Sequence, residues 1–227
     1  RRVLSDLAKH FPGHGDTAED SHYTLPAVHH DRARLDSVEL LPFKRYIYDG
    51  YAGVMTGHLY VPALDKARNK PVSMSRAVVT DLLQKELGFR GLCFTDALAM
   101  KGATTRKSDN PSVMALLAGN DILLAPTAPI NDFAAVKEAL EEGILDREEI
   151  EAKIIKILQY KYIAGLNDYR PVETKGLSER LNSPHAAWLA AKLNEEAITL
   201  LKNEGDIIVA ISAGTGGIAA GTAVKFD

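Results

Sequence analysis

The sequence contains a single cysteine, Cys93, in 227 residues. An internal disulfide is therefore excluded, as is a zinc cluster built on several thiolates. The sequence also lacks a run of about 18 apolar residues, the length that a helix needs to cross a bilayer, so we expect no membrane span. Neither sign of charge dominates, and the formal net charge of −3 gives no reason to expect nucleic acid as a partner.

The remaining composition is that of an ordinary globular protein. Hydrophobic residues make up 46% of the chain and charged residues 25%, a balance typical of a soluble domain. The chain starts at Arg1 without an initiator methionine or a signal sequence, so we expect it to be part of a longer protein. The sequence does not choose between bacterial cytoplasm and periplasm.

Short apolar runs alternate with helical patterns along most of the chain. The predicted strands are residues 3–8, 53–58, 91–95 and 121–126. The predicted helices are residues 34–48, 75–87, 111–118, 132–142 and 146–164, with caps at Ser75, Asn110 and Asp146. Near-continuously apolar strands that alternate with helices form parallel sheets covered by helices. We therefore predict an α/β fold whose four βα units make the C-terminal half of a (β/α)8 TIM barrel.

The end of the chain has a different composition. We predict a half-barrel domain over residues 1–166, a polar linker over 167–184, and a helix and strand of an incomplete second domain or tail over 185–227. The glycine-rich tail contains Gly214-x-Gly216-x-x-Ala219, the spacing of a dinucleotide-binding loop. The chain stops before a helix or a ribose-binding acid can follow, so we do not expect nucleotide binding.

The most unusual segment is residues 9–22, with the sequence KHFPGHGDTAEDSH. It combines three histidines, three carboxylates and a lysine, which a packed core does not accommodate. We interpret it as a loop that brings polar groups together. His10 and His14 have the spacing of a metal pair on a helix, but Pro12 and Gly13 disfavour a helix here, so no metal site is predicted.

Polar residues also end the predicted strands. Lys9 and His10 end the first strand, His58 the second and Asp96 the third. The carboxyl ends of parallel strands gather at one edge, so we expect these residues to share a site. Asp96 is interpreted as a nucleophile or an electrostatic stabiliser, and the alternative is a helix cap or a carboxylate paired with a lysine.

Asp20 and His22 form a second candidate group. A carboxylate beside an imidazole fixes the tautomer of the ring and raises its basicity. The alternative interpretation is a solvated loop with incidental polar residues. His29 and His30 are interpreted as solvated turn surface before the next helix.

Several long motifs, occurring in this order, resemble glycoside hydrolase family 3 in its β-N-acetylglucosaminidase branch. They lie at residues 9–22, 54–65, 86–102 and 118–124, and the resemblance covers about residues 6–165. Residues 193–205 resemble the lead into that family's second domain.

The resemblance implies a role for each candidate residue. Asp96 would be the nucleophile of a retaining mechanism, and His22 would be the general acid/base with Asp20 as its partner. Lys9 and His10 would hydrogen-bond sugar hydroxyls, and the pocket would be lined in part by His58. No metal or organic cofactor is implied.

The implied activity is a retaining exo-β-N-acetylglucosaminidase acting on terminal β-linked N-acetylglucosamine of muropeptides or chitooligosaccharides. A β-glucosidase or β-xylosidase of the same family is one alternative, although such relatives take their acid from another region. A catalytically silent half-barrel, serving assembly or weak sugar binding, is the other. An open half-barrel exposes its edges and interior, so we expect a homodimer or a complementing barrel half.

Overall fold

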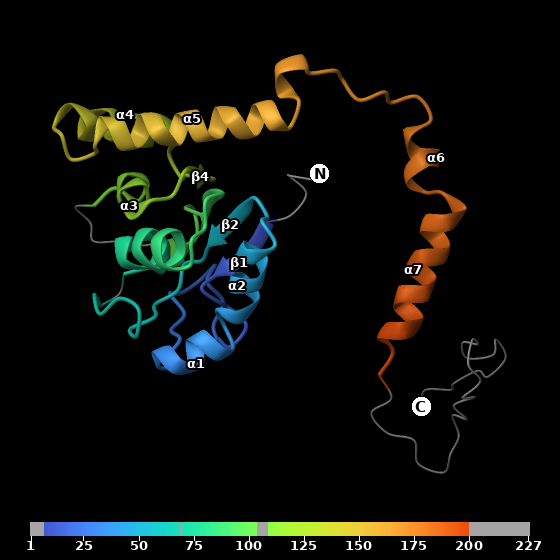
Figure 1. Ribbon diagram of the computed structural model, residues 1–227, viewed down its shortest axis with the longest axis horizontal. Helices are drawn as coiled ribbons and strands as arrows, with labels where there is room; N and C mark the ends of the chain where they lie inside the picture. Colours follow the sequence, from blue (N-terminus) through green and yellow to red (C-terminus); the bar gives the residue numbers. More distant parts are fainter. Residues whose placement is uncertain (1–6, 69, 104–108, 200–227) are drawn as a thin grey trace, which may run out of the picture. The chain divides into compact units, whose positions relative to one another are not determined.

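The computed structural model describes residues 7–68, 70–103 and 109–199. The chain divides into two units, Arg1–Tyr169 and Arg170–Asp227. The first unit is a parallel sheet with helices packed against it (Figure 1). The predicted strand at 206–211 and the glycine-rich tail lie outside the described residues. Within the described ranges, no helix combines the length and apolar character that a membrane crossing requires.

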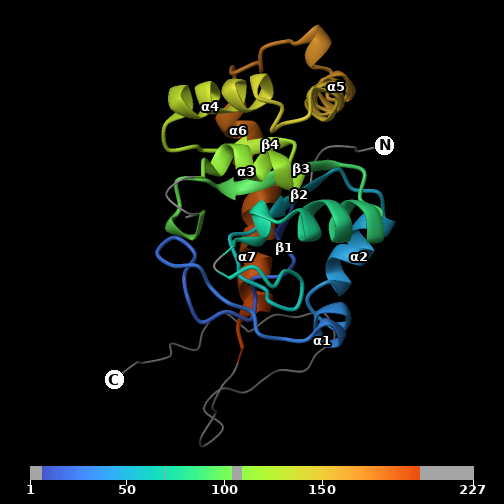
Figure 2. The same ribbon diagram turned by 90° about the vertical axis from the view of Figure 1, so that its left-hand side faces the viewer.

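Four strands run parallel in the sequential order β1-β2-β3-β4 (Figure 2). They are β1 (Leu7–Phe11), β2 (Gly53–Thr56), β3 (Leu92–Ala97) and β4 (Ile122–Leu124). Neighbouring strands of a (β/α)8 barrel follow one another in this way. The predicted parallel α/β fold is therefore present in the first unit.

Helices and helical turns follow the strands. In the first unit they are α1 (Arg32–Ser37), α2 (Leu41–Tyr48), η1 (Val72–Met74), η2 (Ala77–Glu86), η3 (Lys101–Ala103), α3 (Pro111–Ala118), α4 (Pro129–Glu141), α5 (Arg147–Ile163) and η4 (Leu166–Asp168). In the second unit they are α6 (Leu177–Leu181) and α7 (Pro184–Ala197).

One face of the sheet carries the main core. Ala8, Val54 and Cys93 pair in register across β1, β2 and β3, so their side chains lie on the same face. Val54 and Cys93 are fully buried and pack in one cluster with Phe43 of α2 and Leu83 of η2. α2 and η2 therefore cover this face of the sheet.

Two helix predictions are wrong in detail. The predicted helix 34–48 is divided into α1 and α2, and Pro42 lies in the first turn of α2, where a proline needs no amide partner. Ser75 does not cap η2, because its hydroxyl instead donates to Asp65 at 2.5 Å. The predicted caps at Asn110 and Asp146 are confirmed, since each side chain accepts from two backbone amides of its helix.

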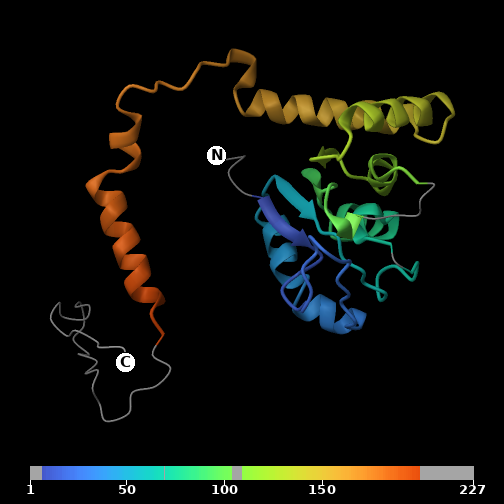
Figure 3. The same ribbon diagram turned by 180° about the vertical axis from the view of Figure 1, so that it is seen from behind.

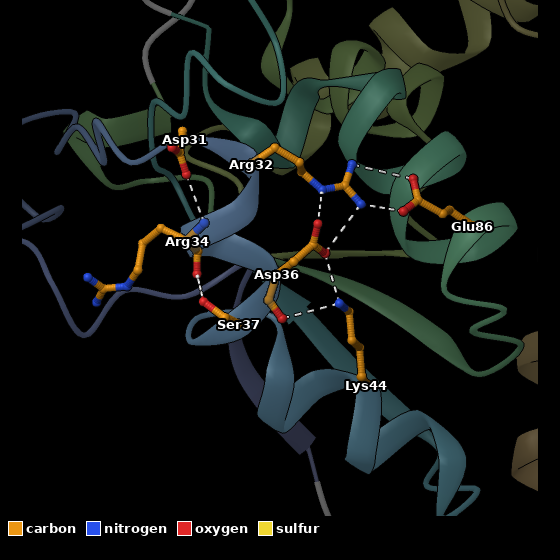
Figure 4. Close-up of polar contacts among 7 residues, drawn as sticks. All are labelled: Asp31, Arg32, Arg34, Asp36, Ser37, Lys44 and Glu86. Atoms are coloured by element: carbon orange, nitrogen blue, oxygen red, sulfur yellow. Dashed lines mark hydrogen bonds and ion pairs between the residues drawn. The ribbon is translucent and has the colours of Figure 1, made fainter.

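An ionic network ties α1 to its neighbours (Figure 4). The Arg32 guanidinium donates to Asp36 in the next turn and to Glu86 at the end of η2. Lys44 of α2 donates to the same Asp36 carboxylate at 2.8 Å. The network therefore holds α1 against α2 and the end of η2.

A buried ion pair ties α5 to the sheet. The Asp121 side chain, directly before β4, is only 1% exposed, and both of its oxygens lie 2.9 Å from Lys156 Nζ of α5. Asp121 Oδ2 also accepts from the Cys93 amide at 2.8 Å. No residue of α5 is fully buried, so this pair is a principal attachment of the helix.

The second unit begins inside the predicted linker. α6 lies within residues 167–184, so that segment is not irregular throughout. α7 begins after Ser183, whose hydroxyl accepts from the Ala186 amide at 3.2 Å. The predicted bounds of the two domains stay a prediction.

Replacement Asp121→Ala should lower the free energy of unfolding by about 2–4 kcal/mol, because it leaves the Cys93 amide without its acceptor and the Lys156 ammonium with only the Gly91 carbonyl. The matched change Asp81→Ala removes an exposed helical pair with Lys85 and should cost less than about 0.5 kcal/mol. Urea denaturation of the complete protein, followed by circular dichroism, measures both losses. Equal losses in the two variants would contradict the role of the Asp121–Lys156 pair as a principal attachment of α5.

Candidate active site

Asp96 lies near the carboxyl end of β3 and is buried, with 8% of its surface exposed. Its Oδ1 accepts from the Ala97 amide at 2.8 Å. Its Oδ2 lies 3.6 Å from Nε2 of His10. One oxygen is therefore held by the backbone, while the other faces a neighbouring imidazole.

An irregularity in β1 brings His10 to this position. Ala8 pairs with Val54 and Phe11 pairs with Thr56, so Lys9 and His10 together stand opposite one residue of β2. This is the arrangement of a β-bulge, which redirects side chains next to functional sites. Lys9 and His10 lie near the carboxyl end of β1, which runs to Phe11, so the predicted end of the strand at residue 8 is too early.

The His10 ring is held in a partly buried environment. Burial lowers the pKa of His10, and this effect outweighs the opposing charge of Asp96. Neutral imidazole is therefore the favoured form beside the Asp96 carboxylate. A neutral ring can both donate and accept a hydrogen bond.

His58 follows β2 and is completely buried. Its Nε2 lies 3.1 Å from the Ala97 carbonyl, which can only accept, so Nε2 carries the proton. Its Nδ1 lies 2.8 Å from the Ser73 hydroxyl, which then donates. Burial lowers the pKa of His58, so the ring stays neutral and fixes the peptide next to Asp96.

Asp20 and His22 form a pair on an exposed loop. Their side chains are 58% and 69% exposed. Asp20 Oδ1 accepts from the His22 amide at 2.9 Å and from His22 Nδ1 at 2.7 Å. These two bonds, the amide bond first, lower the pKa of the Asp20 carboxyl. Since Nδ1 carries the proton, the lone pair of the neutral His22 ring lies on Nε2.

Most of the predicted site residues share one electrostatic environment centred on His10. The charges of Asp96, Lys9 and His22 all act on the pKa of His10. Asp96 and His10 in turn act on the pKa of His58. The loop at His22 and the strand end at Asp96, about 75 positions apart in the sequence, are therefore brought together.

A cavity of about 510 Å³ opens on one side of His10. Lys9 and His10 line it together with Arg34 and Phe43 from the α1–α2 region. Asp96 and His22 are not among its lining residues. The cavity therefore adjoins the group around His10 rather than enclosing it.

Asp16, His30 and Glu39 are the residues with the spacing to hold a metal ion, because their donor atoms lie within 4.8 Å of one another. Hydrogen bonds already join several of these atoms, although Glu39 Oε2 has no partner among the described residues. His30 Nε2 contacts Asp16 Oδ2 at 2.5 Å, and Arg34 donates to Glu39 at 3.0 Å. We assign the group as a polar cluster, in which partly exposed His30 has a partner, Asp16, that its interpretation as solvated turn surface does not include.

Sequence reasoning missed the small residues that hold the histidines. Ser73 pairs with His58, and Ser21 lies 3.1 Å from Nε2 of His14. His14 was considered only as a metal ligand, yet its other nitrogen lies 2.7 Å from Thr17. No motif identifies such partners, because single serines and threonines occur throughout the chain.

Comparison with known proteins decides the family. Residues 2–160 match the Glycosyl hydrolase family 3 N terminal domain. The chain belongs to glycosyl hydrolase family 3. The resemblance inferred from the motifs is thereby confirmed at the family level, and the sheet order is that of this family's N-terminal domain.

Several similar proteins are named as hexosaminidases. Beta-hexosaminidase A of Pseudoalteromonas piscicida is 36% identical over 226 residues, covering 89% of this chain and 37% of the relative. A beta-hexosaminidase of Methylobacillus flagellatus is 34% identical over 130 residues, 57% of this chain and 36% of the relative. The glycoside hydrolase family 3 beta-N-acetylglucosaminidase from Paenibacillus sp. str. FPU-7 gives a TM-score of 0.81 at 35% identity, with 90% of this chain and 39% of that chain covered.

These comparisons also fix how much of the family architecture is present. The chain spans less than two fifths of the length of each of these relatives. Within that span the α/β fold predicted from the sequence is confirmed by the solved structure.

The buried His58 should make stability depend on pH. An unfolded imidazole has a pKa of about 6.5, and burial lowers the pKa of folded His58. As the pH falls through about 6.5, the unfolded chain takes up a proton that the folded state excludes, so stability decreases. His58→Gln, which cannot titrate, should weaken this decrease.

Urea midpoints of the complete protein between pH 7.5 and 5.5, on the order of one unit either side of that pKa, measure the effect. The control His29→Gln changes an exposed histidine and should keep the parent's pH dependence. An unchanged dependence in His58→Gln would show that His58 is not held neutral.

Proposed function

We propose that this chain is the catalytic region of a retaining exo-β-N-acetylglucosaminidase. One observation carries the proposal: the loop of the Asp20–His22 pair is hydrogen-bonded through Ser21 and His22 to residues 101–102, shortly after Asp96 in the chain. Retaining glycosidases need a nucleophile and an acid/base on the same sugar. The names of the hexosaminidase relatives support the same activity.

Asp96 is the proposed nucleophile. Its Oδ2 attacks the anomeric carbon and forms a glycosyl ester as the bond to the leaving-group oxygen breaks. The Ala97 amide holds Oδ1 at 2.8 Å, so the carboxylate is oriented before substrate binds. A fixed nucleophile reduces the entropy cost of reaching the reactive geometry.

His22 is the proposed general acid/base. In the first step its protonated Nε2 gives a proton to the departing oxygen. In the second step neutral Nε2 takes a proton from water, whose oxygen attacks the anomeric carbon and releases Asp96. Asp20 stays ionised and holds Nδ1–H throughout, which stabilises the imidazolium. The usual second carboxylate of a retaining glycosidase is thereby replaced by an imidazole.

Lys9 and His10 are proposed to bind sugar hydroxyls. Both residues stand opposite Met55, and Nε2 of His10 lies 3.6 Å from Asp96 Oδ2. The ammonium donates only, whereas a neutral imidazole donates and accepts, so the two can recognise adjacent hydroxyls. His58 is buried and contacts the peptide after Asp96, so we propose that it positions the nucleophile rather than touching sugar.

The proposed substrates carry a terminal β-linked N-acetylglucosamine, as in muropeptides or chitooligosaccharides. No step in this mechanism needs a metal or an organic cofactor. The relatives' names and the Asp20–His22 pair favour this branch over a β-glucosidase or β-xylosidase.

Asp96→Asn should lower kcat for an aryl N-acetyl-β-glucosaminide by more than about 10³-fold, because the nucleophile is lost. His22→Ala should lower it by about 10²–10⁴-fold. Asp81→Asn, which changes an exposed residue of η2, should leave kcat unchanged.

Azide separates the two roles. It attacks the glycosyl-enzyme without base catalysis, so it should restore His22→Ala and yield the β-glycosyl azide. Asp96→Asn cannot form the glycosyl-enzyme, so azide should give no β-glycosyl azide with this variant. Full activity in either variant, measured by release of the aryl group, would refute the assignment.

We also propose that further strands complete this sheet, either from a second copy or from a complementing barrel half. β1 and β4 are the two outer strands of the sheet (Figure 3). Leu7 of β1 and Leu124 of β4 are each 39% exposed. α5 exposes a row of large apolar side chains, Ile154, Ile155, Leu158, Tyr162 and Ile163. Unpaired strand edges and apolar surface of this kind favour association.

The isolated 227-residue chain should therefore associate. Size-exclusion chromatography with light scattering is expected to give a dimer or larger species, because burial of these edges is favourable. Leu7→Lys and Leu124→Lys, which place charge on the outer strands, should shift the distribution toward monomer. A single monomeric peak for the unchanged chain, with cooperative thermal unfolding, would contradict this proposal.

A further inference from the structure

The loop that carries the Asp20–His22 pair, residues 20–24 and here called the acid/base loop, rests on the main chain of η3. The Gly102 amide donates to the Ser21 carbonyl at 3.2 Å, and the Lys101 amide donates to the His22 carbonyl at 3.4 Å. η3 begins five residues after Asp96. The loop is therefore attached to the same segment that leaves the nucleophile strand.

This attachment needs the absence of a side chain at position 102. A Cβ on Gly102 would lie 2.9 Å from the Ser21 carbonyl oxygen, 2.9 Å from the Thr24 carbonyl oxygen and 3.0 Å from His58 Cβ. Two of these contacts involve backbone atoms, which cannot move without displacing the loop. The φ angle of Gly102 lies outside the left-handed region, so the backbone tolerates alanine and only space forbids it.

Ser21 is held from a second side by His14. Its side chain is buried, and its Oγ lies 3.1 Å from His14 Nε2. The Thr17 hydroxyl donates to the His14 carbonyl at 3.0 Å, so Thr17 Oγ1 must accept from His14 Nδ1 at 2.7 Å. The neutral ring then accepts the Ser21 proton at Nε2. His22 is exposed, but the residue before it, Ser21, is held at both its carbonyl and its hydroxyl.

We propose that Gly102 and Ser21 are positioning residues that fix the acid/base loop relative to Asp96. Gly102 provides the surface on which the loop lies, and Ser21 is the point at which it is held. The roles of His22 and Asp96 rest on the proposed function, whereas the attachment itself can be tested without it. Neither residue takes part in proton transfer.

The variant Gly102→Ala tests the attachment directly. The matched control is Gly15→Ala, because Gly15 has no heavy atom within 4 Å of a built Cβ and no left-handed φ. In the complete protein, hydrogen exchange of peptides covering residues 18–25 and 97–103 should accelerate about tenfold or more in Gly102→Ala, since local opening becomes easier. Gly15→Ala should exchange like the parent.

A kinetic measurement then tests the positioning of the acid. A phenyl leaving group needs proton donation, whereas a dinitrophenyl group leaves without it. For Gly102→Ala we expect kcat/KM on the phenyl N-acetyl-β-glucosaminide to fall about 10–100-fold, and on the dinitrophenyl substrate less than about threefold. Azide should raise the turnover of Gly102→Ala, because it attacks the glycosyl-enzyme without help from the displaced base.

Ser21→Ala gives a second route should Gly102→Ala fail to fold. It removes only the hydroxyl held by His14 and should cause a smaller change of the same kind in both measurements. Its control is Ser37→Ala, since the exposed Ser37 hydroxyl binds only the Arg34 carbonyl among described residues. Parent-like exchange in both Gly102→Ala and Ser21→Ala, or an equal fall on both substrates, overturns the proposal.

The two proposals can fail separately. A parent protein without glycosidase activity would remove the proposed function but leave the exchange experiment readable. An active parent whose Gly102→Ala variant exchanges and reacts like Gly15→Ala would remove the positioning role alone.

Discussion

The candidate site depends on one buried imidazole. His58 donates from Nε2 to the Ala97 carbonyl and accepts at Nδ1 from Ser73, so both of its nitrogens are satisfied without water. A buried ring with an unpaired nitrogen would be costly, which is why both contacts are needed. Since His58 also lies against Gly102, the strand that bears the proposed nucleophile and the surface under the acid/base loop are both positioned by the same side chain.

The sequence predicts the fold well where hydrophobic spacing is strong. Apolar runs identify all four strands of the sheet, and Asn110 and Asp146 mark two helix starts correctly. Hydrophobic spacing does not predict the break within residues 34–48. The apolar residues keep a helical period through this segment, although α1 ends at Ser37 and α2 begins at Leu41, just before Pro42. Spacing also ends the first strand too early, because a bulge allows Lys9 and His10 to lie inside β1, where simple alternation does not expect two consecutive polar residues.

The polar residues of the site are visible in the sequence, but their supports are not. Asp96, His58 and the residue pair Asp20 and His22 stand out because they interrupt apolar runs or crowd into one loop. Ser73 and Ser21 do not stand out, since their contacts join positions whose spacing carries no pattern. Such contacts arise only when the tertiary structure brings loops from successive βα units together at one edge of the sheet.

The bulge in β1 also constrains how this segment could change in length. With two residues opposite Met55, the alternation of β1 is interrupted once, and Phe11 returns to the face packed by α2, where its ring meets Phe43 at 5.1 Å between centroids. Deleting either Lys9 or His10 would restore strict alternation and still leave Phe11 paired with Thr56, because Ala8 and Phe11 would then be two positions apart on one face. Such a deletion would therefore keep the core phenylalanine in place and leave only one polar residue opposite Met55, so the extra residue of the bulge serves the polar site rather than the core.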